Sequence, residues 1–402
     1  MANAQAKKKK KPYLYEVDLM RVIFIFGVLA NHATTAVTTP MKTDSVPYII
    51  MLASHLILHF TRMGFMFISG LVLFLQYYHR KNNSWPAFWV KRYKGSGIPY
   101  VLWNCIYTLF VAVAAQQTLT MTQWGQQVWQ HLLHADGFYM YYLLVMFQLY
   151  LIFPLLVKLF KSLKTTRNHL WLLGISALVQ LLFLFWAKYR FPYIDHTGWP
   201  YMFANYGNFI GSYQFYFLGG AFVSIHYQET IAFLRKHHRA IYWLTALLAV
   251  GTQGLYQFNV KVLGLTRHYA ELIHQPYLFV YATMMVLTVF LLSLEYAKRR
   301  TRPHWQWFAK FVALSSKISF GIYLGQTVAL TFVTKWLSLQ HFGDWQLLFM
   351  APVVYLVALG FTWLMCFFFY KVPPFGILIG RPQGVIKRIL KQLSKKEVPE
   401  ND

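Results

Sequence analysis

The chain has 402 residues, of which 57% are hydrophobic, 19% aromatic and only 12% charged, and its formal net charge is +26. A soluble protein of this length needs far more surface charge, so the composition excludes a soluble globular protein and predicts an all-α polytopic membrane protein. The basic residues lie almost entirely between apolar segments, so their excess does not indicate nucleic-acid binding. Cys105 and Cys366 both lie within apolar segments, which excludes a disulfide framework.

The chain begins with a basic run, Lys7 to Lys11, followed by an apolar segment. Arg21 interrupts that segment and no clean small-residue cleavage site follows, so we expect an uncleaved signal anchor. Residues 1–12 are predicted to be a cytoplasmic tail that rests on anionic membrane lipids. The membrane domain is expected over residues 13–371. Residues 372–402 are predicted to be a basic amphipathic cytoplasmic tail, with GVIKRILKQLSKK as a helix in the plane of the membrane.

Hydropathy predicts about ten transmembrane helices, with both termini in the cytoplasm. The predicted spans are 17–37, 49–77, 98–116, 138–157, 169–188, 208–226, 241–258, 276–296, 318–336 and 347–370. With this division, 30 of the 38 Lys and Arg residues fall on the cytoplasmic side and six on the outside. That asymmetry is what the positive-inside rule requires.

Arg21 and His32 both lie in the first span. Eleven steps of about 100° end only about 20° past three full turns, so the two side chains share one helix face. They are roughly 16 Å apart along the axis, with Arg21 nearer the cytoplasm and His32 in the outer half. Ionisable residues inside a membrane are costly and by default functional. Asp18, one turn before Arg21, is its expected ion-pair partner.

The second span carries a polar stripe of its own, formed by His55, His59 and Arg62 at helical spacing. This span runs inward from the outside, so its histidines are also expected in the outer half. The short connection predicts that the first two spans pack side by side. His32, His55, His59 and Arg62 are therefore predicted to share one cavity.

Three chemistries suit such a cluster. A histidine can act as the general base that deprotonates a hydroxyl for acyl transfer, with a neighbouring cation such as Arg62 stabilising the oxyanion. Histidines can also form a proton relay in a transporter. A metal site is the weakest alternative, since no carboxylate or cysteine completes the ligand set, and we expect no metal. Without a function, these groups are near-interface polar residues hydrogen-bonded to neighbours.

The loops on the two sides differ in character. Lys91, Arg92 and Lys94 precede the third span on the cytoplasmic side, where they suit a diphosphate or nucleotide 3′-phosphate, as in coenzyme A, or lipid headgroups. The outer loops 117–137 and 189–207 are rich in aromatic residues. These suit either stacking on sugar faces or an interfacial aromatic belt.

Four short motifs occur in order along the chain. They are Arg21-x10-His32, FMFISGLVLF with Phe67, Ser69 and Gly70, WVKRYKGSGIPY, and SSKISFGIYLGQ with Tyr323. With these motifs the chain resembles the acyltransferase 3 family, bacterial integral membrane proteins that O-acylate cell-surface carbohydrates. The resemblance covers roughly residues 13–370.

The resemblance implies roles for several residues. His32 is implied to be the catalytic base, Arg21 to position the donor or hold the site together, and Arg92 to contact an acyl-coenzyme A donor that enters from the cytoplasm. The chain departs from the family pattern at Gly95, where a second base is usual, so that Lys94 is the expected substitute. It departs again at Gln326, where a histidine is common, which makes a second titrating base there unexpected.

We therefore expect a multi-pass enzyme of the bacterial cytoplasmic membrane. It is predicted to move an acetyl group, or another short acyl group, from acetyl-CoA to a hydroxyl of a surface or lipid-linked carbohydrate outside. Some family members add a soluble SGNH-hydrolase-like domain; this chain ends about thirty residues past its last predicted span. We therefore expect a stand-alone enzyme, with a separate extracytoplasmic transferase as the alternative. The competing functions are an exporter or flippase of a polysaccharide or its lipid-linked precursor, and a sensor or assembly subunit.

Overall fold

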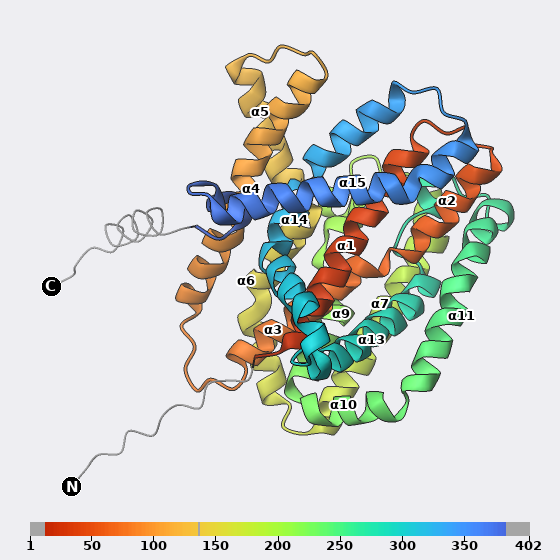
Figure 1. Ribbon diagram of the computed structural model, residues 1–402. Helices are drawn as coiled ribbons and strands as arrows, with labels where there is room; N and C mark the ends of the chain where they lie inside the picture. Colours follow the sequence, from red (N-terminus) through yellow and green to blue (C-terminus); the bar gives the residue numbers. More distant parts are fainter. Residues whose placement is uncertain (1–12, 136, 383–402) are drawn as a thin grey trace, which may run out of the picture.

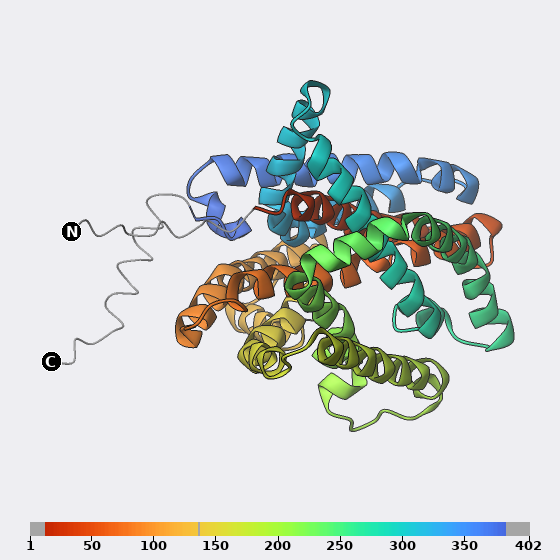
Figure 2. The ribbon, with the colours of Figure 1, turned by 90° about the horizontal axis from the view of Figure 1, so that it is seen from below.

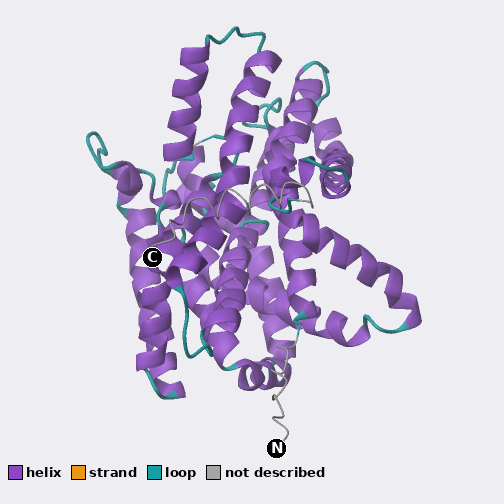
Figure 3. Cartoon of the chain, turned by 90° about the vertical axis from the view of Figure 1, so that its left-hand side faces the viewer, coloured by secondary structure: helices purple, strands orange, loops and turns teal. Residues whose placement is uncertain are grey.

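The computed structural model describes residues 13–135 and 137–382, and the regular elements in that part of the chain are all helices (Figures 1 and 3). The α-helices of this part are α1 (Tyr15–Thr38), α2 (Val46–Ile57), α3 (Phe60–Tyr77), α4 (Trp85–Ala114), α5 (Met121–His134), α6 (Tyr141–Ser162), α7 (Thr166–Tyr189), α8 (Tyr201–Ala204), α9 (Gln214–Ile225), α10 (Tyr227–Lys236), α11 (His238–Gln257), α12 (Arg267–Ala270), α13 (Pro276–Arg299), α14 (Gln306–Ser338) and α15 (Asp344–Lys371). The predicted N-terminal tail and the predicted in-plane C-terminal helix lie outside the described residues.

Seven segments of the described chain are long and apolar enough to cross a membrane. They comprise α1, the α2–α3 pair, α4, α6, α7 with the turn after it, α13 and α15. The other three predicted spans overlap helices α9, α11 and α14. Of these, α9 has only 12 residues, and α11 and α14 are not among the seven segments that are long and apolar enough. The chain is thus an all-helical multi-pass membrane protein over the part described.

Several helices begin at residues whose side chains cap them. The hydroxyls of Ser84 and Thr165 accept hydrogen bonds from backbone N–H groups in the first turns of α4 and α7. Thr120 and Gln123 form a reciprocal capping box at the start of α5. The outer segment expected to be a loop over 117–137 is therefore largely helical, and α5 projects away from the bundle in Figure 1.

The second predicted span is divided into two helices. The N–H of Leu58 bonds to the carbonyl of His55 at 3.1 Å, which is the tighter bond of a three-residue turn. The Ile57 carbonyl accepts a hydrogen bond from the Tyr281 hydroxyl of α13 at 2.9 Å. Tertiary contacts thus stabilise a break at which the sequence has no Pro or Gly. The expectation of one continuous helix over 49–77 is wrong.

Helix α1 lies in the middle of the bundle (Figures 1 and 2). It packs against α2, α3, α13, α14 and α15. Close approach to α3 depends on small residues, since a Cβ on Gly64 would lie 2.4 Å from the ring of Phe24, and one on Gly27 would lie 2.6 Å from Thr61. Helix α1, which carries the candidate residues Arg21 and His32, is therefore closely packed against its neighbours.

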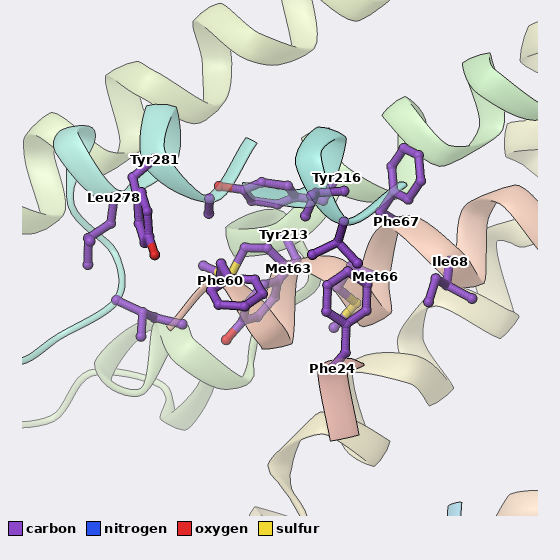
Figure 4. Close-up of a cluster of buried hydrophobic side chains, with 14 of the residues drawn as sticks. Phe24, Phe60, Met63, Met66, Phe67, Ile68, Tyr213, Tyr216, Leu278 and Tyr281 are labelled. Atoms are coloured by element: carbon purple, nitrogen blue, oxygen red, sulfur yellow. The ribbon is translucent and has the colours of Figure 1, made fainter. Parts of the chain in front are cut away.

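The largest cluster of buried side chains joins α1, α3, α9 and α13. Figure 4 shows Phe24 of α1 and Met66 of α3 in this cluster, with Tyr213 and Tyr216 at the start of α9. Phe24 and Met66 are fully buried. This packing fixes α3, and with it Arg62, relative to α1.

Candidate active site

A single cavity of about 580 Å³ brings Arg21 and His32 of α1 together with residues of α3, α4, α6 and α14. Eleven steps along α1 separate the two residues by roughly 16 Å, so the cavity follows about half of the helix. Its volume is within the range of about 300–1,000 Å³ typical of ligand-binding pockets. The shared helix face inferred from spacing alone is therefore confirmed as one wall of a cavity.

The charge of this cavity has one sign. The charged side chains that line it are Arg21, Arg62, Lys91, Arg92, Lys317 and Arg381. None of the described residues that line it is acidic. A cleft of uniformly positive charge concentrates anions, and its ligand is expected to carry several negative charges.

Arg21 lies beside a buried carboxylate. Its Nη1 is 3.8 Å from Oδ1 of Asp18, as predicted from the spacing, and its side chain is 32% exposed. Asp18 also accepts hydrogen bonds from the Tyr13 hydroxyl at 2.8 Å and from Oγ of Ser316 at 2.7 Å. The carboxylate is therefore fully engaged, and it holds Arg21 at the cavity wall.

The His32 ring stacks on Tyr139, with 3.8 Å between ring centroids and 28° between planes. Phe138 and Tyr139 both have positive φ angles, 60° and 61°, an uncommon and strained conformation for aromatic residues. Their carbonyls accept hydrogen bonds from two hydroxyls of α14, Thr327 at 3.3 Å and Tyr323 at 2.7 Å. The fold thus stabilises a strained turn that places an aromatic ring against His32.

Sequence reasoning missed Tyr139. It lies in a connection between helices, without periodicity or motif, and only the three-dimensional packing reveals it. His32 itself makes no side-chain hydrogen bond to any residue in the described ranges, so its ring nitrogens stay available to a ligand.

Arg62 reaches the same cavity from α3. Its Nη1 donates to the Tyr213 hydroxyl at 3.2 Å, and its guanidinium lies 4.0 Å from the centroid of the Tyr141 ring. Ser69, one of the motif residues, lines the cavity two turns further along α3 and shares a hydrogen bond of 3.2 Å with the Tyr142 hydroxyl. Neutral aromatic groups, rather than a carboxylate, thus hold Arg62, which leaves its charge uncompensated.

His55 and His59 do not line the cavity, contrary to expectation. Thr34 Oγ1 lies 2.6 Å from His55 Nδ1, and Asn31 Nδ2 lies 3.3–3.4 Å from both rings. The Nε2 of His59 donates to the carbonyl of Glu271 at 2.8 Å. The break between α2 and α3 turns these rings toward hydrogen-bond partners in the fold, so the prediction of a four-residue cavity is correct only for His32 and Arg62.

Lys91 and Arg92 of α4 also line the cavity. Arg92 bonds to Gln76, which lies 14 residues, roughly 21 Å, beyond Arg62 along α3, so these bases are at the end remote from His32 and Arg62. Arg92 Nη2 donates to Gln76 Oε1 at 2.9 Å, which orients its guanidinium. Lys94, on the same turn of α4, is not among the lining residues, so the expectation that it takes over from Gly95 is not supported.

Two further bases, Lys317 of α14 and Arg381 after α15, complete this end. Lys317 lies within the fourth motif but was not selected as a site residue, and Arg381 was placed in the predicted C-terminal tail. Arg381 lies 290 residues along the chain from Lys91, and no spacing rule connects such distant positions.

Gln326 is fully buried in α14, and neither atom of its amide has a hydrogen-bond partner among the described residues. It does not line the cavity. Within the described ranges, no group of three or more His, Cys, Asp or Glu side chains is placed to hold a metal ion.

A family model described as an acyltransferase domain matches residues 14–371, nearly the whole chain. No curated protein and no solved structure matches it. Because the family match spans the whole membrane domain, including Arg21, His32 and the four motifs, the chain belongs to the acyltransferase 3 family of membrane acyltransferases.

Proposed function

We propose that the protein transfers an acetyl or other short acyl group from cytoplasmic acyl-CoA to a hydroxyl of an extracytoplasmic glycan. One observation carries this proposal: a single cavity has an available histidine at one end and a cluster of bases at the other. Acyl-CoA has the matching polarity, with a reactive thioester at one end and a phosphate-bearing nucleotide at the other. Lys91 and Arg92 are proposed to bind the phosphates.

The proposed reaction is a direct transfer. His32 removes the proton from the acceptor hydroxyl, and the oxygen attacks the thioester carbonyl. Arg62, whose charge no carboxylate neutralises, stabilises the tetrahedral oxyanion. The C–S bond then breaks, the ester stays on the acceptor, and the CoA thiolate receives the proton from His32. Arg21, oriented by Asp18, is proposed to hold the pantetheine arm between the two ends.

In the proposed topology the chain crosses the membrane ten times, with both termini in the cytoplasm of a bacterium. In this scheme α9, α11 and α14 cross the membrane beside the seven apolar segments. The scheme places Lys91, Arg92 and Lys317 on the cytoplasmic side, and 30 of the 38 Lys and Arg residues with them. The donor then enters from the side where acyl-CoA is made.

Sealed vesicles test this function. The full chain is reconstituted with surface glycan from its host enclosed, and acetyl-CoA labelled in the acetyl group is added outside. Base-labile label on the enclosed glycan is the expected result, and vesicles without the chain serve as the control. Movement of unlabelled glycan across the membrane would instead identify an exporter. If the glycan is neither labelled nor moved, both proposed functions are contradicted.

Replacing Tyr139 with Leu tests the ring contact with His32. Leucine keeps apolar bulk but removes the flat surface on which the imidazole stacks, so His32 gains freedom to leave its reactive orientation. We expect kcat to fall about tenfold to a hundredfold, while KM for acetyl-CoA stays near the wild-type value. Tyr139→Phe keeps the ring and should retain activity. Equal activity of the Leu and Phe variants would contradict a positioning role.

A further inference from the structure

The segment after α15 folds back onto the membrane domain at the cavity. It contains a short helix, η6 (Phe375–Ile379), that contacts α4, α14 and α15. Trp103 Nε1 of α4 donates to the Leu378 carbonyl at 2.8 Å. Ile379 is 1% exposed and packs where a Cβ on Gly321 of α14 would lie 2.4 Å from it. These residues were expected to belong to an amphipathic tail, but they are part of the packed core and lie beyond the family match, which ends at residue 371.

A glycine sets the direction in which the chain leaves η6. Gly380 has φ of 67°, in the left-handed region that favours glycine. A Cβ here would lie 2.9 Å from the Gly95 carbonyl oxygen of α4 and 3.1 Å from the Phe320 ring of α14. The N–H of Arg381 bonds to the Gly376 carbonyl at 2.8 Å. The turn is thus fixed against both helices, and Arg381 follows it directly.

Arg381 is bonded to α14 through its Nε. Its Nε donates to the backbone carbonyl of Lys317 at 2.6 Å. Both side chains line the cavity, and no carboxylate in the described part of the chain pairs with either. Two exposed cations that line one cavity without a counter-ion suit an anion with more than one charge.

We infer that Lys317 and Arg381 complete the donor site by binding phosphate groups at the nucleotide end of acyl-CoA, together with Lys91 and Arg92 of α4. The inference rests on the proposed function. It assigns a binding role to the segment after α15, whose Gly380 packs against Gly95, the position at which the family pattern usually has a second base. Phosphates of anionic lipid headgroups have the same chemistry, so the test must separate the two sources.

The test uses the purified full chain in nanodiscs and compares three donors: acetyl-CoA, its dephospho form without the 3′-phosphate, and S-acetyl-pantetheine, which has no phosphate. Lys317→Gln removes a charge but keeps the backbone carbonyl that holds Arg381. Arg381→Gln removes the second charge, and Arg381→Lys restores it without the Nε bond. Lys371→Gln is the matched control, because Lys371 is a base of the same C-terminal region that does not line the cavity.

We expect Lys317→Gln and Arg381→Gln each to weaken binding of acetyl-CoA about tenfold, the loss typical of one charge-assisted hydrogen bond. Binding of S-acetyl-pantetheine should not change, Arg381→Lys should recover part of the loss, and Lys371→Gln should behave as wild type. A structural role would weaken binding of all three donors alike.

The outcomes separate this inference from the proposed function. If the wild type binds acetyl-CoA no better than S-acetyl-pantetheine, the proposed donor is wrong. If it prefers acetyl-CoA and the variants keep that preference unchanged, only the inference about Lys317 and Arg381 is wrong. Loss of co-purifying anionic lipid with unchanged donor binding would assign the two bases to headgroups and overturn the inference.

Discussion

Replacing His32 with Ala is expected to abolish acyl transfer while the protein remains folded in the membrane. A positioned general base contributes about 10²- to 10⁴-fold to a reaction rate, and among the residues that the structure describes no other histidine lines the cavity to replace it. The measurement is the content of base-labile acyl esters on the surface glycan of cells that express the variant, normalised to membrane protein level. The glycan itself should still reach the surface, because the substitution removes acyl transfer and not the synthesis or export of the glycan.

Two companion variants make this result specific. His32→Gln keeps a polar side chain of similar size and should be as inactive as His32→Ala, and added imidazole should restore part of the activity of the alanine variant. His341→Ala removes an exposed histidine outside the cavity and should keep full activity. Esters at wild-type level in His32→Ala cells would remove His32 from the mechanism, and loss of the glycan together with its esters would favour an exporter.

The sequence predicted those features of the site that depend on one helix at a time. Arg21, His32 and Asp18 belong to α1, whose 24 residues form one uninterrupted helix, so spacing alone gave their common face and their order along the axis. The same reasoning failed for His55 and His59, because tertiary hydrogen bonds break the helix between them and Arg62. A helix broken by contacts with α13 leaves no local signal in the sequence.

Residues that enter the site from distant parts of the chain were beyond prediction. Lys317 lies in the fourth motif but was one base among six in its predicted cytoplasmic segment, and Arg381 belonged to an expected tail. Their selection depends on the turn of η6 and on Gly380, which only the folded chain reveals. Hydropathy located α9 and α14 but not their extents: α9 is a helix of only 12 residues, and α14 has 33 residues that include the fully buried Gln326.

Close contact between α3 and α9 supplies the prediction with the largest effect on stability. Gly220→Ala should destabilise the protein strongly, because the new Cβ would lie 2.0 Å from the Phe67 carbonyl oxygen and 2.8 Å from the Leu71 nitrogen. Gly70→Ala should do the same from the other side, at 2.0 Å from the Phe217 carbonyl oxygen. Overpacking a core costs typically about 1–3 kcal/mol, and here the atoms in the way belong to two helix backbones that cannot change rotamer. The two helices must move apart.

Gly219→Ala is the matched control for this prediction, since it adds the same methyl group one residue earlier in α9. Its Cβ would meet only a Phe67 ring atom at 4.0 Å, and alanine has the higher helix propensity, by about 1 kcal/mol. The apparent melting temperature of the purified chain in detergent should therefore be unchanged or slightly higher for Gly219→Ala and lower by several degrees for Gly220→Ala and Gly70→Ala. Equal melting temperatures for the two adjacent α9 variants would show that the helices are not in backbone contact at this crossing. Because α3 carries Arg62 and Ser69 into the cavity, a shift of α3 should also reduce acyl transfer in whatever fraction of the Gly70→Ala protein still folds.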